Sequence, residues 1–141
     1  MQDRFKFRLW IKDMGLYFTK PCIFLNTDGL LVSDDGVKVY EIDQKAHIIE
    51  FCTGLKDRNQ KLIYEGDILD FDLSTPKNGG HYRGFIRWQE QNDLIGWVIS
   101  DMDMVGEWDL RQIAHPNDWM VYGEIIGNIH ENADLIKVGG K

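Results

Sequence analysis

The carboxylates between Asp101 and Asp109 are the residues of this chain best suited to chemistry. The group comprises Asp101, Asp103, Glu107 and Asp109. Hard cations such as Mg²⁺ and Ca²⁺ take oxygen ligands from clusters of this kind, but this spacing lacks the regular ligand positions and the glycine of a calcium-binding loop. Acidic runs are more often solvated loops. We therefore expect no bound metal and no cofactor.

The other residue types that commonly catalyse reactions lack the spacing that catalysis needs. The histidines are scattered, with no pair at metal-ligand spacing, at His47, His81, His115 and His130. No serine lies in a Gly-x-Ser-x-Gly context, and Gly79-Gly80 is too short a glycine-rich segment to cradle a phosphate. The sequence therefore predicts a protein that is not an enzyme.

The tryptophans are candidates for binding rather than catalysis. Trp88 and Trp97 flank one predicted hairpin, and both are expected to pack inside a small barrel. Trp108 and Trp119 lie beside polar loops, where a large aromatic side chain often anchors a partner protein. Core packing is the more common role for each of them, because large aromatic side chains are highly buried on average. Trp108 and Trp119 are therefore the candidate partner-binding residues.

The net charge bears on nucleic-acid binding. It is −7 at pH 7, and a field of that sign repels a phosphate backbone unless a local basic patch overcomes it. The residues that can form such patches are Lys6, Arg8, Arg83 and Arg87. Alternating charges on a strand are more often its solvated face. Nucleic-acid contact through these four residues is therefore the alternative hypothesis, and protein binding is the leading one.

Composition indicates a single compact unit with a real core. The chain has 141 residues, of which 43% are hydrophobic and 12% aromatic. No apolar run approaches the roughly 20 residues that span a bilayer, so we expect no membrane association. Cys22 and Cys52 are the only cysteines, and their spacing fits free thiols in a reducing cytoplasm better than a disulfide framework. We expect the protein to be cytoplasmic.

Short strands separated by turns are expected to position these residues. Phe5, Phe7, Leu9 and Ile11 share one face of an alternating pattern, which predicts a strand whose other face carries Lys6, Arg8 and Trp10. Further strands are expected at 22–25, 30–33, 37–42, 46–52, 62–64, 68–71, 81–88, 94–100 and 120–129. Residues 101–109 are expected to be irregular, 110–114 a helical turn, and 131–138 a short helix capped by Asn132.

The chain is thus predicted to be mainly β, α+β at most. A small β lobe is expected over residues 1–52, and a small barrel with the C-terminal helix over residues 53–141. The stretch from Thr53 to Phe71 is the centre of this arrangement. It contains a polar turn at 57–60 and a Glu65-Gly66-Asp67 turn, at which Gly66 is expected to adopt a positive φ angle.

Three segments of the sequence resemble the YopX family of phage and prophage proteins. They are Thr53-Gly-Leu-Lys-Asp57 with Asn59, Ile63-Tyr-Glu-Gly-Asp-Ile68, and Ile125-Ile-Gly-Asn-Ile-His-Glu-Asn132. The start, Arg4 to Trp10, is similar to the family's opening strand. The sequence departs from the family pattern at Gln60, often Gly in the family, and at His130, often Tyr. The resemblance implies a phage setting and an SH3-like barrel, and it supplies no catalytic residues.

These observations predict a non-catalytic phage or prophage accessory protein, in the cytoplasm of a bacterial host, that binds a host or phage protein or its own copies. Self-association is suggested by the strand at 46–52, because Ile48, Ile49 and Phe51 give it apolar groups on both faces. A second copy that covers one face would form a homo-oligomer, most often a symmetric dimer.

Overall fold

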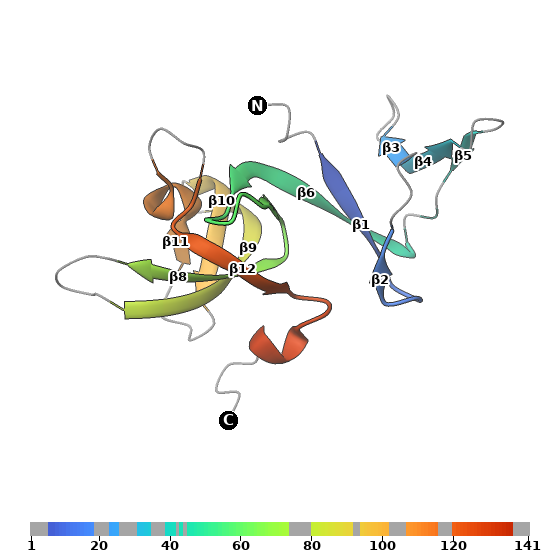
Figure 1. The fold of residues 1–141 in the computed structure, drawn as a ribbon. Helices are drawn as coiled ribbons and strands as arrows, with labels where there is room; N and C mark the ends of the chain where they lie inside the picture. The colour runs from blue at the N-terminus through green and yellow to red at the C-terminus, as the bar shows by residue number, and fades with distance from the viewer. Residues whose placement is uncertain are drawn as a thin grey trace. The chain divides into compact units, whose positions relative to one another are not determined.

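The computed structural model describes residues 6–18, 23–25, 31–34, 39–41, 43, 45–73, 80–91, 94–101, 107–115 and 120–136. These residues are mostly β-strand with two short 3₁₀ helices, so the predicted mainly β class is confirmed (Figure 1). The chain divides into two compact units, Arg8–Glu50 and Met1–Phe7 with Phe51–Lys141. In the part of the chain described, no helix combines the length and apolar character needed to cross a membrane.

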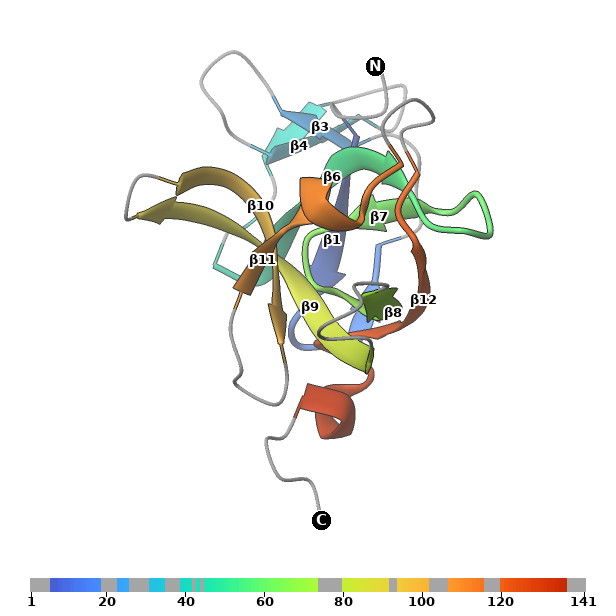
Figure 2. The ribbon, with the colours of Figure 1, turned by 90° about the vertical axis from the view of Figure 1, so that its left-hand side faces the viewer.

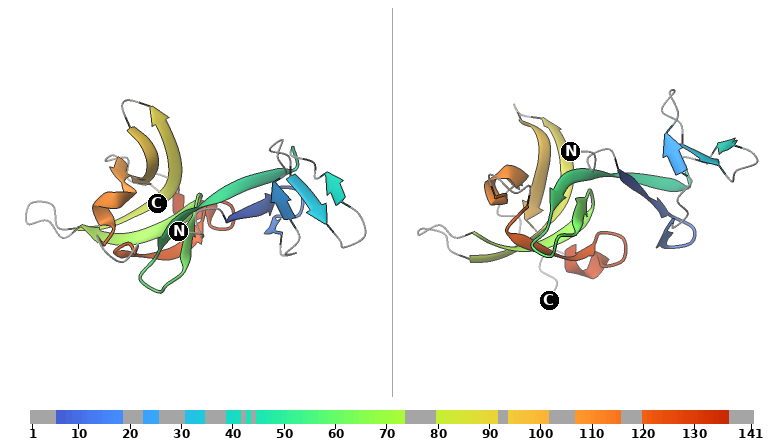
Figure 3. Two further views of the ribbon diagram at one scale, coloured as in Figure 1. Left: turned by 90° about the horizontal axis from the view of Figure 1, so that it is seen from above. Right: turned by 45° about the horizontal axis from the view of Figure 1, so that its top comes forward.

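The unit Arg8–Glu50 contains a hairpin and a small sheet. Strands β1 (Phe7–Ile11) and β2 (Leu16–Tyr17) pair antiparallel across a turn at Gly15, which has a φ angle of 61°. A three-stranded antiparallel sheet follows in the order β3-β4-β5 (Figure 3), and its strands are β3 (Ile23–Leu25), β4 (Leu31–Asp34) and β5 (Val39–Glu41). Strands β1, β3, β4 and β5 lie within two residues of the positions predicted from alternation and turn chemistry. Strand β2 was not expected.

A buried carboxylate organises this first unit. Glu50 is only 2% exposed, and its Oε1 accepts hydrogen bonds from Arg8 Nε at 3.0 Å and from the Tyr17 hydroxyl at 2.8 Å. The Arg8 guanidinium lies 4.5 Å from the centre of the Tyr17 ring, and Trp10 meets the same ring edge-on at 5.0 Å. The sequence placed Arg8 and Trp10 on a solvated face. That expectation is wrong, because Trp10 is 9% exposed and a buried carboxylate requires a paired cation.

The second unit is a five-stranded antiparallel sheet in the order β11-β10-β9-β8-β12. Its strands are β8 (Asp67–Leu73), β9 (Gly80–Gln91), β10 (Leu94–Asp101), β11 (Glu107–Asp109) and β12 (Gly123–Asn128). The 3₁₀ helix η2 (Leu110–Ile113) precedes the last strand, which returns to pair with β8. This meander with a returning fifth strand is the connectivity of an SH3-like barrel.

Strand β6 (His47–Lys56) is longer than the expected 46–52 and is paired along both edges. It lies in a sheet ordered β2-β1-β6-β7, in which β7 is Leu62–Tyr64. Its last residue, Lys56, forms a parallel bridge with Met120 at the entry to the last strand. The Cys52 thiol on this strand is buried and accepts a hydrogen bond from the Gly54 amide, whereas Cys22 lies outside the described residues.

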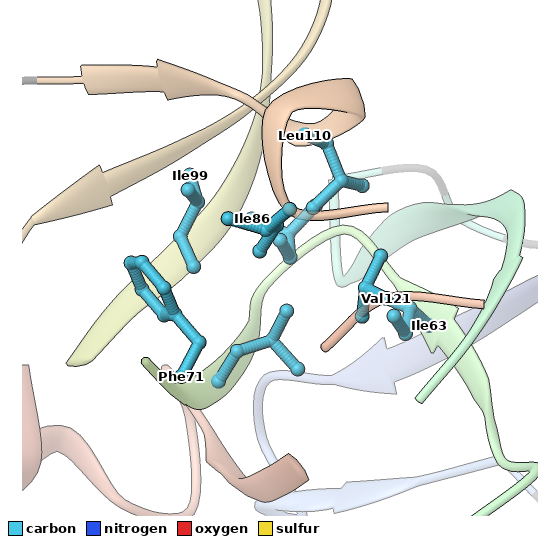
Figure 4. Packing of buried hydrophobic residues seen from close by; sticks show 8 residues of the cluster. Ile63, Phe71, Ile86, Ile99, Leu110 and Val121 are labelled. Atoms are coloured by element: carbon cyan, nitrogen blue, oxygen red, sulfur yellow. The ribbon is translucent and has the colours of Figure 1, made fainter. Parts of the chain in front are cut away.

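The core of the second unit is formed by apolar side chains from β7, β8, β9, β10 and η2, together with Val121 (Figure 4). The cluster consists of Ile63, Leu69, Phe71, Ile86, Ile99, Leu110, Ile113 and Val121. Burying each aliphatic side chain of this size contributes roughly 1.5–3 kcal/mol. Leu110 and Ile113 come from η2, so the predicted helical turn at 110–114 is confirmed, and it contributes two side chains to the core.

Two details differ from the expected secondary structure. Residues 107–109 are a strand paired with β10 rather than irregular chain. The C-terminal helix η3 (Ala133–Ile136) is a single 3₁₀ turn, and the side chain of Asn132 does not cap it. The Leu135 amide donates to the backbone oxygen of Asn132, while Asn132 Oδ1 accepts from the Asn128 amide. The Asn132 side chain thus binds the backbone amide at the end of β12 instead of the amides of η3, a contact that a local sequence pattern does not reveal.

The turns at 57–60 and 65–66 each contain a residue with a positive φ angle. Gly66 has φ 88°, which confirms the expectation for the Glu65-Gly66-Asp67 turn. Its amide donates to Ile86 O at 2.8 Å, and its carbonyl accepts from the Ile129 amide at 2.9 Å. Gln60 has φ 68°, a conformation that glycine adopts without strain. The turn at 57–60 is thus of the kind that favours the glycine found in the family at this position.

Replacing Gln60 with glycine should stabilise the protein. A side chain in the left-handed region costs about 1 kcal/mol, so Gln60→Gly should raise the free energy of unfolding by up to that amount. Lys61→Gly is the matched control, because Lys61 is exposed, adjacent and has no positive φ. That variant should lower stability. Urea unfolding of both variants measures the difference, and a destabilised Gln60→Gly protein would contradict the strain at this turn.

Candidate protein-binding surface

The first family-like segment begins with a threonine that bridges a break in the sheet. The ladder between β6 and β7 shifts register between Cys52 and Lys56. Within this break, Thr53 Oγ1 donates to Ile63 O at 2.9 Å and accepts from the Leu55 amide at 3.1 Å. The hydroxyl therefore replaces ladder hydrogen bonds that the bulge removes. Thr53 therefore has a structural role in this sheet.

Asp57 binds two distant parts of the backbone at once. Its side chain is 0% exposed. Oδ1 accepts from the amides of Asn59 and Lys61, both at 2.9 Å, and Oδ2 accepts from the Ile125 amide at 3.0 Å. The last of these amides lies where β12 has an irregular register, between Ile125 and Gly127. One carboxylate thus closes its own turn and secures the bulged strand of the barrel.

The third family-like segment is held by two asparagines. Asn128 Oδ1 accepts from the amides of His130 and Glu131, at 3.0 and 2.9 Å. Asn132 Oδ1 accepts from the Asn128 amide at 3.1 Å, and the Asn132 amide donates to Asn128 O at 3.0 Å. A Cβ atom on Gly127 would overlap with the Asn132 side chain. The close approach of Asn132 to the strand therefore requires glycine at position 127.

Asp67 completes the pattern in the second segment. It is 2% exposed, and its Oδ2 accepts from the Tyr64 amide at 2.8 Å. The side chains of Thr53, Asp57, Asp67, Asn128 and Asn132 thus all accept hydrogen bonds from backbone amides of turns and bulges. Among the described residues, no three His, Cys, Asp or Glu side chains come together in a way that could hold a metal ion.

An exposed ion pair lies over the turn that Asp57 closes. Arg58 Nη2 lies 2.6 Å from Glu124 Oε2, and Asn59 Nδ2 donates to Glu124 Oε1 at 3.2 Å. The hydrogen bond from Arg58, then that from Asn59, then the charge of Arg58 hold the pKa of Glu124 below its ordinary value of 4.5. Both ion-pair side chains are well exposed, at 59% and 40%, so solvent screens the interaction.

Two of the four cations proposed for nucleic-acid contact are engaged within the protein. Arg8 is paired with the buried Glu50. Arg87 donates from Nε to Ser100 Oγ and from Nη2 to Gln89 Oε1, both at 2.8 Å. Lys6 and Arg83 are exposed. Arg83 lies opposite Asp70 on β8, so a carboxylate accompanies it on the neighbouring strand.

Trp108 packs against the core. It is half-buried and meets the Phe71 ring edge-on, with centroids 5.8 Å apart, and it lies 5.4 Å from Tyr82. Trp119 lies outside the described residues, as does most of the acidic segment 101–109. Of that segment, Asp109 is half-buried on β11, opposite Val98.

The hairpin of β9 and β10 continues the apolar face of the core beyond the barrel. Ile86 and Ile99 pair across the two strands within the core. Two residues further along the same face, Trp88 pairs with Trp97, because side chains alternate between faces of a strand. The next residue on this face of β10 is Ile95. The two strands run out together at the left of Figure 2.

The end of this face is exposed to solvent. Ile95 is 75% exposed and Trp88 is 42% exposed, while Trp97 is half-buried against the core. The indoles of Trp88 and Trp97 meet edge-on at 5.1 Å, and Trp88 Nε1 donates to Glu90 Oε1 at 2.8 Å. We call Trp88, Ile95 and Trp97 the apolar hairpin face. The expectation that Trp88 packs inside the barrel is wrong, because β9 continues beyond Phe85, the last of its residues that pairs with β8.

Sequence reasoning missed Ile95 as a surface residue. Its signal was present in the alternation of Ile95, Trp97 and Ile99, which places all three on one face of β10. The same alternation does not reveal at which residue the barrel ends. Only the register with β8, which pairs with β9 as far as Phe85 and not beyond, shows that the tip of the hairpin has no strand behind it.

The fold defines a class: a small SH3-like barrel together with a smaller β unit. The family model described as "YopX protein" matches residues 6–137. The chain therefore belongs to the YopX family.

Two solved structures are similar to this chain over nearly their whole length. Protein EF1440 from Enterococcus faecalis has a TM-score of 0.58 and 21% identity, with 94% of this chain and 97% of that chain covered. Protein yopX from Bacillus subtilis has a TM-score of 0.54 and 10% identity, with 93% and 95% covered. At these identities the likeness shows the fold alone. No protein of curated function matches the chain.

Asp57→Asn should destabilise the protein severely. The new amide group would point an N–H at a backbone N–H, and buried unsatisfied donors cost about 1–3 kcal/mol each, so we expect a loss of about 3 kcal/mol or more. Asp43→Asn is the matched control, because exposed Asp43 accepts a single amide hydrogen bond, from Lys45. That change should stay within about 0.5 kcal/mol. Equal urea unfolding midpoints for Asp57→Asn and Asp43→Asn would show that the hydrogen bonds of Asp57 do not stabilise the fold.

The Glu124 carboxyl should titrate below pH 4.5 in the folded protein. A lowered folded pKa means that the ion pair stabilises the fold fully above the unfolded pKa, and that this contribution is lost as the pH falls through the folded pKa. Arg58→Ala should move the pKa back toward 4.5, whereas Lys61→Ala in the same turn should leave it in place. NMR titration of the Glu124 side-chain carboxyl carbon measures both, and an unchanged pKa in Arg58→Ala would refute the assigned cause.

Proposed function

We propose that this protein is a non-catalytic phage or prophage accessory protein of the bacterial cytoplasm that acts by binding another protein through the apolar hairpin face. Membership of the YopX family supports the phage setting through the resemblance described above. The inward direction of Thr53, Asp57, Asp67 and Asn128 supports a non-catalytic role, because these side chains are occupied by backbone groups.

The observation that carries the proposal is the exposure of Ile95 beside the indole pair. A β-branched side chain that is 75% exposed, next to a tryptophan that is 42% exposed, offers a partner an apolar surface with a large aromatic anchor. Exposed apolar residues that form one group on one element mark interaction sites more often than scattered ones do. Tryptophan is also among the residue types that contribute most to binding energy at protein interfaces.

Binding to nucleic acid is the weaker candidate. It would use Lys6 and Arg83, since Arg8 and Arg87 are already engaged, and the net charge of −7 opposes it. Self-association is a form of the same proposed activity. If two copies associate through β6, we expect Phe51 to form the apolar contact. Its side chain is 39% exposed, and its ring centroid lies 6.2 Å from that of Phe7.

The test is capture of partners from lysates of phage-infected bacteria on the immobilised protein. We expect a protein that binds the wild type in nuclease-treated lysate and, once purified, binds it directly. Ile95→Asp should abolish this binding. Met14→Asp is the control, because Met14 is similarly exposed, at 65%, but lies in the β1–β2 turn.

Retention that nuclease removes would instead favour the nucleic-acid alternative. Equal retention by the wild type and Ile95→Asp would place the binding surface elsewhere. Circular dichroism of both variants shows that loss of binding is not loss of folding.

A further inference from the structure

The outer edge of β10 is open where it passes the apolar hairpin face. β11 pairs with β10 only at Val98, Ile99 and Ser100. Between Leu94 and Trp97, β10 pairs with β9 on one side, and no described residue pairs with it on the other. An open edge presents a row of backbone N–H and C=O groups that another strand can pair with.

Gly96 makes this edge easy to approach. It has a φ angle of 156°, and no atom lies within 4 Å of the position that a Cβ would occupy. The register with β9 runs without interruption through Gly96, paired with Gln89, so the glycine does not mark a bulge. The φ angle itself favours glycine here, and a glycine inside a strand also allows another backbone to come close.

We propose that the edge of β10 at Leu94–Trp97 receives an extended, basic segment of a partner protein as an added strand. This rests on the proposed function and specifies its mode of binding. Alternate residues of the added strand would lie on the same face as Ile95 and Trp97 and cover them. Backbone hydrogen bonds supply affinity in this mode, and the side-chain contacts supply specificity.

The size of the surface favours a short segment over a second copy. The exposed parts of Trp88, Ile95 and Trp97 amount to roughly 400 Å² at most, given side chains of no more than about 250 Å² each. A stable interface between folded proteins buries about 800 Å² on each partner. An added strand of a few residues matches the smaller area, and its backbone uses the open edge as well.

Charge favours a basic segment. The chain carries −7 at pH 7, which attracts cationic partners and opposes a second copy. Exposed Glu90 lies opposite Ile95 on β9. It is two strand spacings, about 10 Å, from the added strand, within reach of a long lysine or arginine side chain laid across Ile95.

The probe is a displayed library of random peptides selected on the purified protein. We expect selected peptides to be rich in apolar residues alternating with Lys or Arg and poor in Pro, and to lose binding to Ile95→Lys but not to Met14→Lys. In NMR spectra they should shift the amides of Ile95, Gly96 and Trp97, and slow hydrogen exchange only at the amides whose N–H points to the open edge. N-methylation of the peptide should reduce affinity about tenfold at every second position and little at the others, because only one edge of the peptide bonds to β10.

Three results would overturn the strand addition. They are selected peptides that are acidic or proline-rich, the absence of any peptide sensitive to Ile95→Lys, and an N-methylation profile without a period of two. Amide shifts at Ile95–Trp97 that grow with protein concentration alone would make a second copy the occupant instead. A partner captured in an Ile95-dependent manner, with no period of two in its binding segment, would refute the added strand while leaving the proposed function in place.

Discussion

The carboxylate of Asp57 is the interaction on which the barrel depends. It is buried, and it accepts three backbone hydrogen bonds, two from its own turn and one from Ile125. Turns and bulges leave backbone N–H groups without ladder partners, and a buried amide without a partner is costly. Asp57 satisfies such groups at the point where the chain enters the barrel and at the point where the last strand closes it.

The same solution recurs at Thr53, Asp67 and Asn128, each of which gives an oxygen to backbone N–H groups at a turn or bulge. The polar residues of the three family-like segments are therefore explained by the architecture of the barrel alone. The hairpin of β9 and β10 differs from these segments, because its two strands extend past the barrel and leave Trp88 and Ile95 exposed.

Most of the strands could be predicted from the sequence, because alternation and turn chemistry are local signals, and the SH3-like barrel was implied by the resemblance to the YopX family. β7 was predicted at its observed bounds, and Gly66 has the positive φ angle expected of it. Trp10 was misplaced, because alternation shows which residues share a face and not that Glu50 lies buried against Arg8 and Tyr17. The exposure of Trp88 was missed for a related reason. It is set by where β8 stops pairing with β9, and that is a property of two strands together.

The separation in sequence between the partners of Asp57 also constrains how the chain can fold. Asp57 and Ile125 are 68 residues apart, and the ion pair of Arg58 with Glu124 spans 66. During synthesis, strands β8 to β11 can form their meander as each one emerges, since every strand pairs with its predecessor. The turn at 57–61, by contrast, can make its contact with Ile125 only after β12 has been synthesised. Until that strand leaves the ribosome, the carboxylate that closes the barrel has only its local amides to bind, and the meander keeps an open edge along β8. Contacts between distant residues slow folding, so completion of this barrel is expected to be a late step.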